Sequence, residues 1–201
     1  MFAVIRELYI DQNPVGEVPW ADRPGQMKQT APVKDQQTVT PDGKMIGKQI
    51  KDLVIRPART QTDRRGELVE VYDPAWKIHP APMVYAYQAS IRPKAIKGWV
   101  VHKKQDDRIY TCLGVMRWVF YDLRENSPTY QLLNQFTFSE RNRVLLIIPA
   151  GVYHAVQNVG ETEAIFFNLP TRPYDYEDPD KYRLPPKNDL IPFDFDDPTS
   201  W

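Results

Sequence analysis

A histidine follows a proline–glycine turn at Pro149, Gly151 and His154, and these residue types together could do chemistry. The proline ends the apolar segment 144–148 because it has no N–H to give to a strand ladder. Gly151 allows a tight reversal, and the chain then re-enters extended structure with His154 among apolar neighbours. Two interpretations follow for this imidazole. It is either a core histidine bound to a backbone carbonyl, or a histidine directed into a barrel as a ligand or a proton-transfer group.

A second histidine, His102, precedes two carboxylates at Asp106 and Asp107. Two histidines and one carboxylate suit a site for non-haem iron or manganese. His102, Asp106 and His154 are therefore one candidate metal site. Asp107 is the alternative carboxylate. The third histidine, His79, has no motif around it and is expected to lie in a loop.

The composition excludes several classes of function. Lysine plus arginine and aspartate plus glutamate both number 26, so no overall basic field argues for nucleic acid or an anionic membrane. No stretch approaches the roughly 18 apolar residues of a spanning helix, and the first residues lack the pattern of a signal peptide. The single cysteine, Cys112, excludes an intrachain disulfide and fits a reducing compartment. We therefore expect a cytoplasmic protein with no nucleic-acid or membrane partner.

Short strands must position the chemical side chains. Apolar and polar residues alternate in short segments spaced about ten residues apart, with turn residues between them. The segments expected as strands are 51–56, 68–72, 83–91, 99–102, 109–113, 115–123, 130–139, 144–148, 153–159 and 164–169. This spacing is typical of an all-β sandwich or barrel, and no segment has the pattern of a long amphipathic helix. We predict one all-β barrel domain at 46–175.

Two proline-rich segments flank the predicted barrel. Residues 1–45 carry turn signals and little periodic pattern, so we predict an N-terminal extended arm that packs on the barrel or on a partner subunit. Residues 176–201 are acidic and proline-rich, and we predict a C-terminal tail that docks on the barrel through Phe193 and Phe195. Residues 174–180 are a candidate for a single helical turn.

The stretch 149–158, with its proline, glycine, histidine and asparagine, resembles the second motif of the cupin barrels. The first cupin motif consists of a glycine, two histidines two residues apart and a carboxylate. The segment 98–114 stands in that place, where His102 matches the second histidine and Val100 occupies the position of the first. The resemblance implies a cupin (jelly-roll) β-barrel in which His154 faces the interior.

Four motifs resemble the dTDP-4-dehydrorhamnose 3,5-epimerase family of sugar-nucleotide cupins. They follow the family's order and read D-R-R-G-E-L-V-E at 63–70, I-K-G-W at 96–99, Y-D-L-R and S-P-T within 121–129, and I-P-A-G-V-Y-H at 148–154. Each motif alone is weak, and their shared order gives the resemblance its weight. It implies epimerisation or isomerisation of a dTDP-4-keto-6-deoxy sugar in carbohydrate biosynthesis, by a homodimer that requires no cofactor.

The resemblance also implies a set of substrate-binding residues. Arg65 and Glu70 match residues that contact the nucleotide, often across the dimer. Lys97 stands where the family usually has a phosphate-facing arginine, and Arg108 lies near the family's basic pyrophosphate contact. The alternative for each is an exposed or salt-bridged charge. His154 completes the expected set as a residue of the pocket.

Two catalytic positions depart from the family's pattern. The resemblance implies a histidine base, held by an aspartate, and a tyrosine acid on the other face of the sugar. The base position holds Val100, and the nearest match to the tyrosine is Phe167. Neither side chain can transfer a proton. The supporting aspartate corresponds to Asp189.

Three explanations of these departures stay open. His102, two residues from Val100 on the same face of the predicted strand, could act as the base. The acid would then be one of the tyrosines Tyr85, Tyr87, Tyr110 or Tyr153. Alternatively, the candidate metal site holds iron or manganese. The third explanation is a cupin that binds a sugar nucleotide without catalysing its epimerisation.

Overall fold

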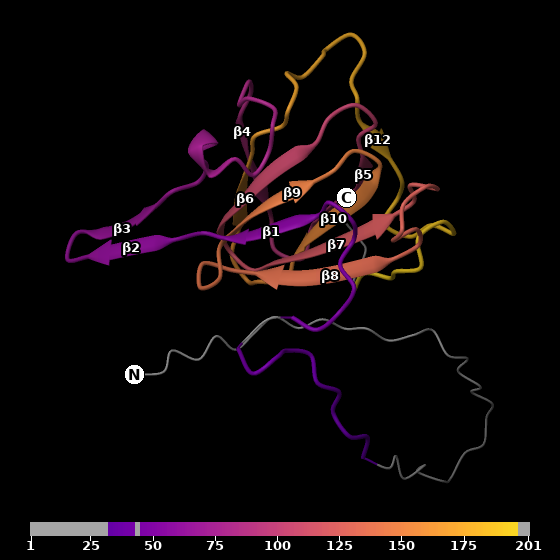
Figure 1. The fold of residues 1–201 in the computed structure, drawn as a ribbon, viewed down its shortest axis with the longest axis horizontal. Coiled ribbons are helices and arrows are strands. Elements are labelled where there is room, and N and C mark those ends of the chain that lie inside the picture. Colours follow the sequence, from indigo (N-terminus) through magenta and orange to yellow (C-terminus); the bar gives the residue numbers. More distant parts are fainter. Residues whose placement is uncertain (1–31, 43–44, 197–201) are drawn as a thin grey trace.

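The computed structural model describes residues 32–42 and 45–196 of the 201-residue chain. Most of the predicted arm, at 1–31 and 43–44, therefore lies outside the described residues. Its described part, 32–42, is mostly exposed, and Figure 1 shows this segment running clear of the strands. The chain enters the body at Ile50 and Leu53, which are both buried in the core.

Two five-stranded antiparallel sheets form the body (Figure 1). The first sheet has the order β1 (Val54–Pro57), β9 (Val144–Ile148), β6 (Asp107–Leu113), β11 (Ala164–Asn168) and β4 (Tyr87–Ile91). The second sheet has the order β12 (Tyr182–Arg183), β5 (Ile96–Val101), β10 (Val152–Asn158), β7 (Met116–Asp122) and β8 (Leu133–Phe138). This architecture confirms the predicted all-β fold. None of the described residues forms a helix long and apolar enough to cross a bilayer.

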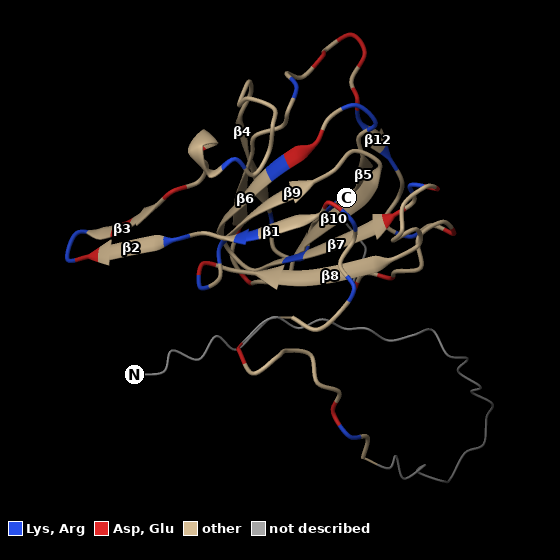
Figure 2. Ribbon diagram, viewed as in Figure 1, with Lys and Arg blue, Asp and Glu red and all other residues tan. Residues whose placement is uncertain are grey.

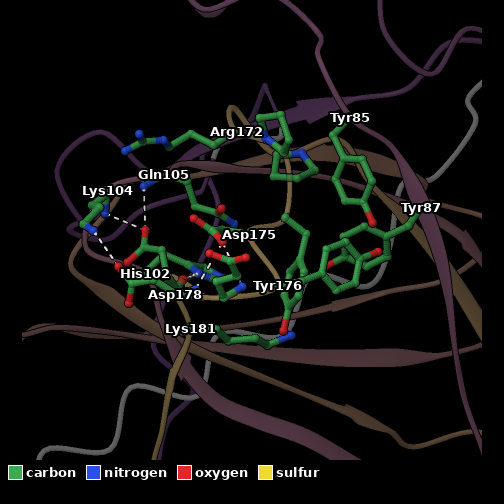
Figure 3. Close-up of a pocket in the computed structure, with 15 residues that line it drawn as sticks. Tyr85, Tyr87, His102, Lys104, Gln105, Arg172, Asp175, Tyr176, Asp178 and Lys181 are labelled. Atoms are coloured by element: carbon green, nitrogen blue, oxygen red, sulfur yellow. Dashed lines mark hydrogen bonds and ion pairs between the residues drawn. The ribbon is translucent and has the colours of Figure 1, made fainter.

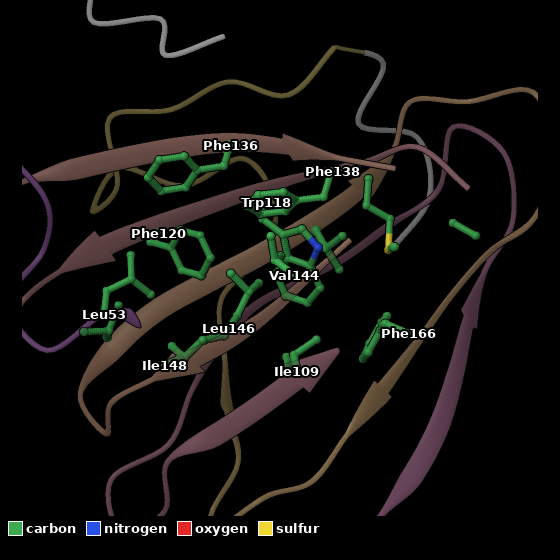
Figure 4. Close-up of a cluster of buried hydrophobic side chains, with 14 of the residues drawn as sticks. Leu53, Ile109, Trp118, Phe120, Phe136, Phe138, Val144, Leu146, Ile148 and Phe166 are labelled. Carbon is green, nitrogen blue, oxygen red and sulfur yellow. The ribbon is translucent and has the colours of Figure 1, made fainter. Parts of the chain in front are cut away.

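An aromatic-rich core fills the space between the sheets (Figure 4). The sequence of β8 fits a strand with one face on the core, because its residues are alternately half-buried and buried along its whole length. Phe136 and Phe138 of β8 are both buried with Trp118 and Phe120 of β7. Each such side chain contributes about 1.5–3 kcal/mol by leaving water.

The strand predicted at 68–72 was expected to be half-buried in the body, and this expectation is wrong. Residues 66–69 form β3 (Gly66–Val69), which pairs only with β2 (Thr60–Asp63) in a separate two-stranded hairpin. Figure 1 shows this hairpin extending away from the body, and Figure 2 shows charged residues at its tip. Leu68 remains 59% exposed, so its apolar side chain does not reach the core of this chain. A 3-10 turn, η1 (Pro74–Trp76), lies between the hairpin and β4.

The C-terminal segment contributes a strand to the second sheet, in addition to docking on the body. β12 extends the second sheet by pairing with β5, with Tyr182 opposite Val101. Further on, the rings of Phe193 and Phe195 pack on Trp99 at centroid distances of 6.2 and 5.5 Å. Between β11 and β12, the helical turn expected at 174–180 does not form, and this segment is an irregular loop.

Candidate active site

A cavity of about 400 Å³ lies between the two sheets and draws its lining from both. The lining includes Tyr87, Lys97, Val100, His102, Asp107, Trp118, His154, Asn168, Lys181 and Arg183. An outer hollow of about 590 Å³ adjoins it, because Tyr87, His102 and Lys181 line both spaces. Figure 3 shows this outer hollow, with Tyr176 and Asp178 of the β11–β12 loop among its walls.

Neighbouring strands bring the two predicted histidine motifs together. β10 carries His154 and pairs with β5, so that His154 lies opposite Val100. His102 directly follows β5, and its carbonyl accepts a 2.7 Å hydrogen bond from the Gly151 N–H. Gly151 has a φ of 84°, in the left-handed region that glycine tolerates best. The turn predicted from the sequence thus fixes one histidine motif against the other.

His102, Asp107 and His154 form a buried trio, called the His–Asp–His cluster below. The histidines are each 7% exposed and the aspartate is 3% exposed. Asp107 Oδ2 lies 3.2 Å from His102 Nε2 and 3.5 Å from His154 Nε2. One ligand atom from each residue lies within 4.8 Å of the other two. All three residues are among those that line the cavity.

Hydrogen bonds determine which nitrogen of each imidazole carries a proton. The Nδ1 atom of His102 contacts the carbonyl oxygen of Asp180, and that of His154 lies 3.2 Å from the carbonyl oxygen of Val152. Because a carbonyl oxygen only accepts, both Nδ1 atoms must be the donors. A neutral imidazole then has its lone pair on Nε2. Both Nε2 atoms therefore face the same carboxylate oxygen, and each can donate a hydrogen bond to it only when its ring is protonated.

The electrostatics of the cluster call for a compensating positive charge. Burial alone would lower the pKa of His102, but the hydrogen bond and charge of Asp107 outweigh it and raise the pKa. Burial alone would raise the pKa of Asp107, but hydrogen bonds from both histidines hold it well below its usual range. A carboxylate buried against two lone pairs is stable only with a proton or another cation among them.

The carboxylate of the cluster differs from the expected ones. Asp106, placed in the candidate metal site by its spacing, instead accepts a 2.8 Å hydrogen bond from His79 Nε2. Neighbouring residues of an extended segment point in opposite directions, so Asp107 enters the cavity where Asp106 does not. Asp189, expected to support the base, is exposed on the C-terminal segment. The carboxylate that contacts His102 is Asp107, which corrects both expectations.

Asp180 holds the loop beside His102 in place. Its carboxylate accepts hydrogen bonds of 2.7–3.0 Å from the backbone N–H groups of residues 103, 104 and 105. Its own carbonyl accepts the Nδ1–H of His102. Asp180, in the β11–β12 loop, therefore binds both the His102 ring and the backbone that follows His102.

Three cations line the cavity, and Lys97 is the one that the sequence predicted. Lys181 and Arg183 stand two residues apart across β12 and so lie on one side of it. Burial, together with the charges of Arg183 and Lys97, lowers the pKa of Lys181. Among the described residues, no carboxylate forms an ion pair with any of these three. Lys181 and Arg183 were missed because the C-terminal segment is acidic overall, although the alternation Lys–Tyr–Arg at 181–183 is visible in the sequence.

A bulge explains how Lys97 reaches the cavity. The register between β10 and β5 shifts between His154 and Val156, so Lys97 and Val100, three residues apart, both line the cavity. Only glycine fits at Gly98 between them, because a Cβ there would lie 2.5 Å from the Cβ of Ala155.

Arg108 does not bind pyrophosphate in this arrangement, which corrects the expectation for it. The side chain is fully buried, and its guanidinium makes five hydrogen bonds within the protein. Four go to backbone carbonyls and one to the Tyr72 hydroxyl, at 2.7–3.2 Å. A guanidinium has five N–H donors, so none is left for a ligand. Arg108 fastens the loops around the cavity.

The hairpin holds the remaining two predicted binding residues away from the cavity. Arg65 lies at the turn between β2 and β3, where its side chain is 81% exposed and pairs with Asp63. Glu70 follows β3 and is also exposed. Neither lines the cavity of its own chain.

The structure separates the candidate tyrosines. Tyr85 and Tyr87 line the outer hollow, and Tyr87 also lines the inner cavity. Tyr110 packs on Phe167 at a centroid distance of 6.5 Å, and neither belongs to the cavity lining. Phe166 and Asn168 face the cavity in place of Phe167, so the expectation that Phe167 occupies the acid position does not fit the structure.

Two unpartnered polar atoms in the cavity wall were not foreseen. Trp118 Nε1 and Asn168 Oδ1 are buried and have no hydrogen-bond partner among the described residues. The Asn168 amide does donate a 2.9 Å hydrogen bond to the Tyr87 hydroxyl. Buried polar groups normally find partners, so both atoms are exceptions to the satisfied interior.

Comparison with protein families matches residues 47–190 to the model of dTDP-4-dehydrorhamnose 3,5-epimerase. A probable low-salt glycan biosynthesis epimerase of Haloferax volcanii is 33% identical over 137 residues, which cover 68% of this chain and 88% of the relative. A spore coat polysaccharide biosynthesis protein of Bacillus subtilis is 36% identical over 103 residues, which cover 51% of this chain and 68% of the relative.

Solved structures share the fold. A dTDP sugar isomerase from Desulfovibrio desulfuricans superposes with a TM-score of 0.67 at 24% identity, covering 72% of this chain and 90% of that one. A dTDP-6-deoxy-D-glucose-3,5-epimerase from Legionella pneumophila, in complex with dTDP-4-keto-L-rhamnose, gives 0.62 at 21% identity, covering 69% and 76%.

Proposed function

The chain belongs to the dTDP-4-dehydrorhamnose 3,5-epimerase family, and from this premise we propose that it epimerises or isomerises a dTDP-4-keto-6-deoxy sugar. The related Haloferax protein, named as a probable epimerase, supports the reaction type. The Legionella structure supports the substrate class, because it holds a dTDP-4-keto sugar in the same fold.

The observation that carries the proposal is the set of unpaired cations around the cavity. Lys97, Lys181 and Arg183 line one cavity, and their mutual repulsion is not relieved by any described carboxylate in an ion pair. A nucleoside diphosphate is an anion that would relieve it, and a guanidinium can bind phosphate oxygens through two parallel hydrogen bonds. We place the diphosphate at these three residues and the sugar beside the His–Asp–His cluster of the same cavity.

The cavity also offers groups for moving a proton next to a ketone. The acceptor atoms come from the His–Asp–His cluster, so we assign catalysis to this cluster and keep His102 as a catalytic residue. The C–H bond next to the ketone breaks, its electron pair forms the double bond of an enolate, and an acceptor of the cluster takes the proton.

Tyr87 is the candidate for returning a proton. Burial and the charge of Asp107 raise the pKa of Tyr87 to about 12, so its hydroxyl stays protonated at neutral pH. The Asn168 amide donates to the phenol oxygen, which leaves the phenolic hydrogen free for the substrate. Delivery of a proton to the opposite face of the enolate would invert the carbon.

We also propose a homodimer, in which the hairpin reaches a partner subunit. A two-stranded hairpin is at best marginally stable by itself in water. Every residue of β2 and β3 except Val69 is exposed, including the apolar Leu68. Burial of the hairpin against a second copy would stabilise it and would bring Arg65 and Glu70 to a nucleotide bound by the partner.

Solvent exchange tests the proposed reaction. The protein is incubated in deuterated buffer with a dTDP-4-keto-6-deoxy sugar, and proton NMR follows the signals of the carbons beside the ketone. We expect these signals to disappear as deuterium enters. Binding of dTDP without any exchange would contradict an epimerase and would instead support a cupin that only binds the sugar nucleotide.

A further inference from the structure

β12 and the residue before it bring two cations to the cavity, yet the strand itself is short. It has only two residues, both exposed, and it forms an edge of the second sheet. Lys181 and Arg183 flank Tyr182 and line the cavity together with Lys97. Burial lowers the pKa of Lys181, and the charges of Arg183 and Lys97 lower it further, because the three cations repel one another. Other contacts must therefore hold β12 against the sheet.

The segment 184–196 that follows β12, called the C-terminal strap below, supplies these contacts through Trp99 of β5. The Trp99 N–H and carbonyl each form a hydrogen bond with the backbone of Leu184, at 3.0 and 3.1 Å. The Trp99 indole N–H donates a 3.2 Å hydrogen bond to the carbonyl of Pro186. Trp99 is fully buried, and Phe195 of the strap lies in the same apolar cluster. The strap is therefore anchored directly after the two cations.

The apolar cluster around Trp99 lies on the face of the second sheet away from the main core. Val119 of β7 belongs to it, whereas its neighbours Trp118 and Phe120 belong to the core between the sheets. Neighbouring residues of a strand point to opposite faces. Trp99 and Phe195 therefore act from behind the sheet, and neither lines the cavity or the outer hollow.

A polar contact fastens the far end of the strap. The carboxylate of Asp196 lies 2.9 Å from Arg117 Nη1, and the Asp196 carbonyl accepts a 2.6 Å hydrogen bond from Gln157 Nε2. Arg117 and Gln157 lie opposite each other in β7 and β10, so the strap crosses the sheet from β5 to these strands. The Asp196 side chain is 85% exposed, so its ion pair contributes little, and the apolar cluster is what holds the strap.

We propose that Trp99 and Phe195 are positioning residues for the diphosphate, because they hold the strap and thereby keep Lys181 and Arg183 in the cavity. This role rests on the proposed function, which places the diphosphate at these cations. A diphosphate bound between the cations relieves their repulsion and so favours the docked strap. By thermodynamic reciprocity, a docked strap must favour diphosphate binding by the same factor.

The His–Asp–His cluster is held separately from the strap. His102 is oriented by the carbonyl of Asp180, which precedes β12. The Asp180 carboxylate is in turn fastened by the backbone N–H groups of residues 103–105. Asp107 and His154 lie on β6 and β10. A loosened strap should therefore weaken diphosphate binding and raise KM, while kcat stays nearly unchanged.

Amide hydrogen exchange of the full chain tests the coupling without any reaction. Mass spectrometry follows peptides from 182–196 in the free protein and in the protein saturated with dTDP or with inorganic pyrophosphate. We expect either anion to slow exchange in the strap by at least about 5-fold, the lower end of usual couplings between two sites. Peptides from the β7–β8 loop, 123–132, are the internal control and should exchange at the same rate in all three samples.

Phe195→Ala removes the ring that packs on Trp99, and it should weaken dTDP and pyrophosphate binding by about 5- to 150-fold with little change in kcat. Phe195→Leu keeps an apolar side chain in the cluster and should restore most of the affinity. Phe138→Leu is the matched control, because Phe138 is buried in the core between the sheets and does not line the cavity. It should lower the melting temperature and leave dTDP affinity unchanged, which separates positioning from stability.

Two results would overturn the positioning role. One is unchanged exchange in the strap when the unaltered protein is saturated with dTDP, and this result decides the question even if Phe195→Ala does not fold. The other is a folded Phe195→Ala that binds dTDP and pyrophosphate as tightly as the unaltered protein. An unaltered protein that binds dTDP but moves no proton of the keto sugar would contradict the proposed reaction alone, because the amide exchange and binding measurements use no ketone.

Discussion

Among single residues, Tyr87 offers the most direct test of the proposed proton transfer. Tyr87 lines the inner cavity, and its hydroxyl keeps its proton because its pKa is raised to about 12, and it accepts a hydrogen bond from Asn168. Tyr87→Phe should lower kcat by about 10²–10⁴-fold, the usual contribution of a positioned acid, and leave dTDP affinity unchanged. Steady-state kinetics and calorimetry measure the two effects. Tyr110→Phe is the control, since Tyr110 lies outside the cavity lining, and an equal kcat in both variants would remove Tyr87 from the mechanism.

Lys181 and Arg183 should bind the diphosphate. A hydrogen bond to a charged group contributes about 1.5–3 kcal/mol, so Lys181→Met and Arg183→Met should each weaken dTDP binding by about 10-fold or more. Lys103→Met is the control, because it makes the same change of charge at a lysine that packs over the Tyr182 ring. Lys103 lines neither the inner cavity nor the outer hollow. Calorimetric titration with dTDP measures the three affinities. If the Lys103 variant bound dTDP as weakly as the other two, the loss of affinity would come from overall charge and not from a diphosphate site.

Which residues enter the site could be predicted only where a motif fixes them. His102 and His154 were found from spacing, because a glycine turn and a strand direct them inward. The choice between Asp106 and Asp107 depends on a single residue of register at the start of β6, which no local pattern reveals. Phe167 does not line the cavity because β11 alternates without interruption and turns Phe166 and Asn168 inward.

At the scale of elements, the loop between β7 and β8 should make stability depend on pH. Burial would raise the pKa of Asp122, but hydrogen bonds from Arg124, Ser127 and Thr129 outweigh it and lower the pKa to about 2. The folded-state pKa lies below the unfolded value near 4, so this stabilisation is complete above about pH 4 and is lost as the pH falls toward 2.

Asp122→Asn should therefore lower the free energy of unfolding at pH 7 by about 1–3 kcal/mol, because buried donors lose a charged acceptor. Thermal melts between pH 7 and pH 2 should show a weaker pH dependence in the variant than in the unaltered protein. Parallel curves for the two proteins would show that another carboxylate governs acid unfolding.

The elements divide into those that local pattern reveals and those that it does not. The strands from β6 to β11 were predicted nearly in place, because each is an alternating segment or a short apolar run with turn residues near its ends. β12 has only two residues, Tyr182 and Arg183, and forms because β5 offers a free edge. The hairpin has a strand pattern, but the sequence carries no sign that it leaves the body.

The whole molecule should be a dimer held in part by the hairpin. Light scattering after size-exclusion chromatography should give twice the chain mass of 23.5 kDa. Leu68→Glu places a charge on the exposed apolar side chain of β3 and should shift the protein toward monomer. Leu190→Glu alters another exposed leucine, on the C-terminal segment, and should leave the mass unchanged. A monomeric unaltered protein would contradict the proposed dimer.

The central claim is that a proton next to a ketone is moved at the His–Asp–His cluster. Deuterium incorporation from solvent into a dTDP-4-keto-6-deoxy sugar measures this directly in the unaltered protein, Asp107→Asn and Asp106→Asn. We predict exchange in the unaltered protein and in Asp106→Asn, whose carboxylate pairs with His79 outside the cluster. Asp107→Asn should lose exchange while it still binds dTDP. Exchange that persisted in a folded Asp107→Asn, or that was absent from the unaltered protein, would contradict the account.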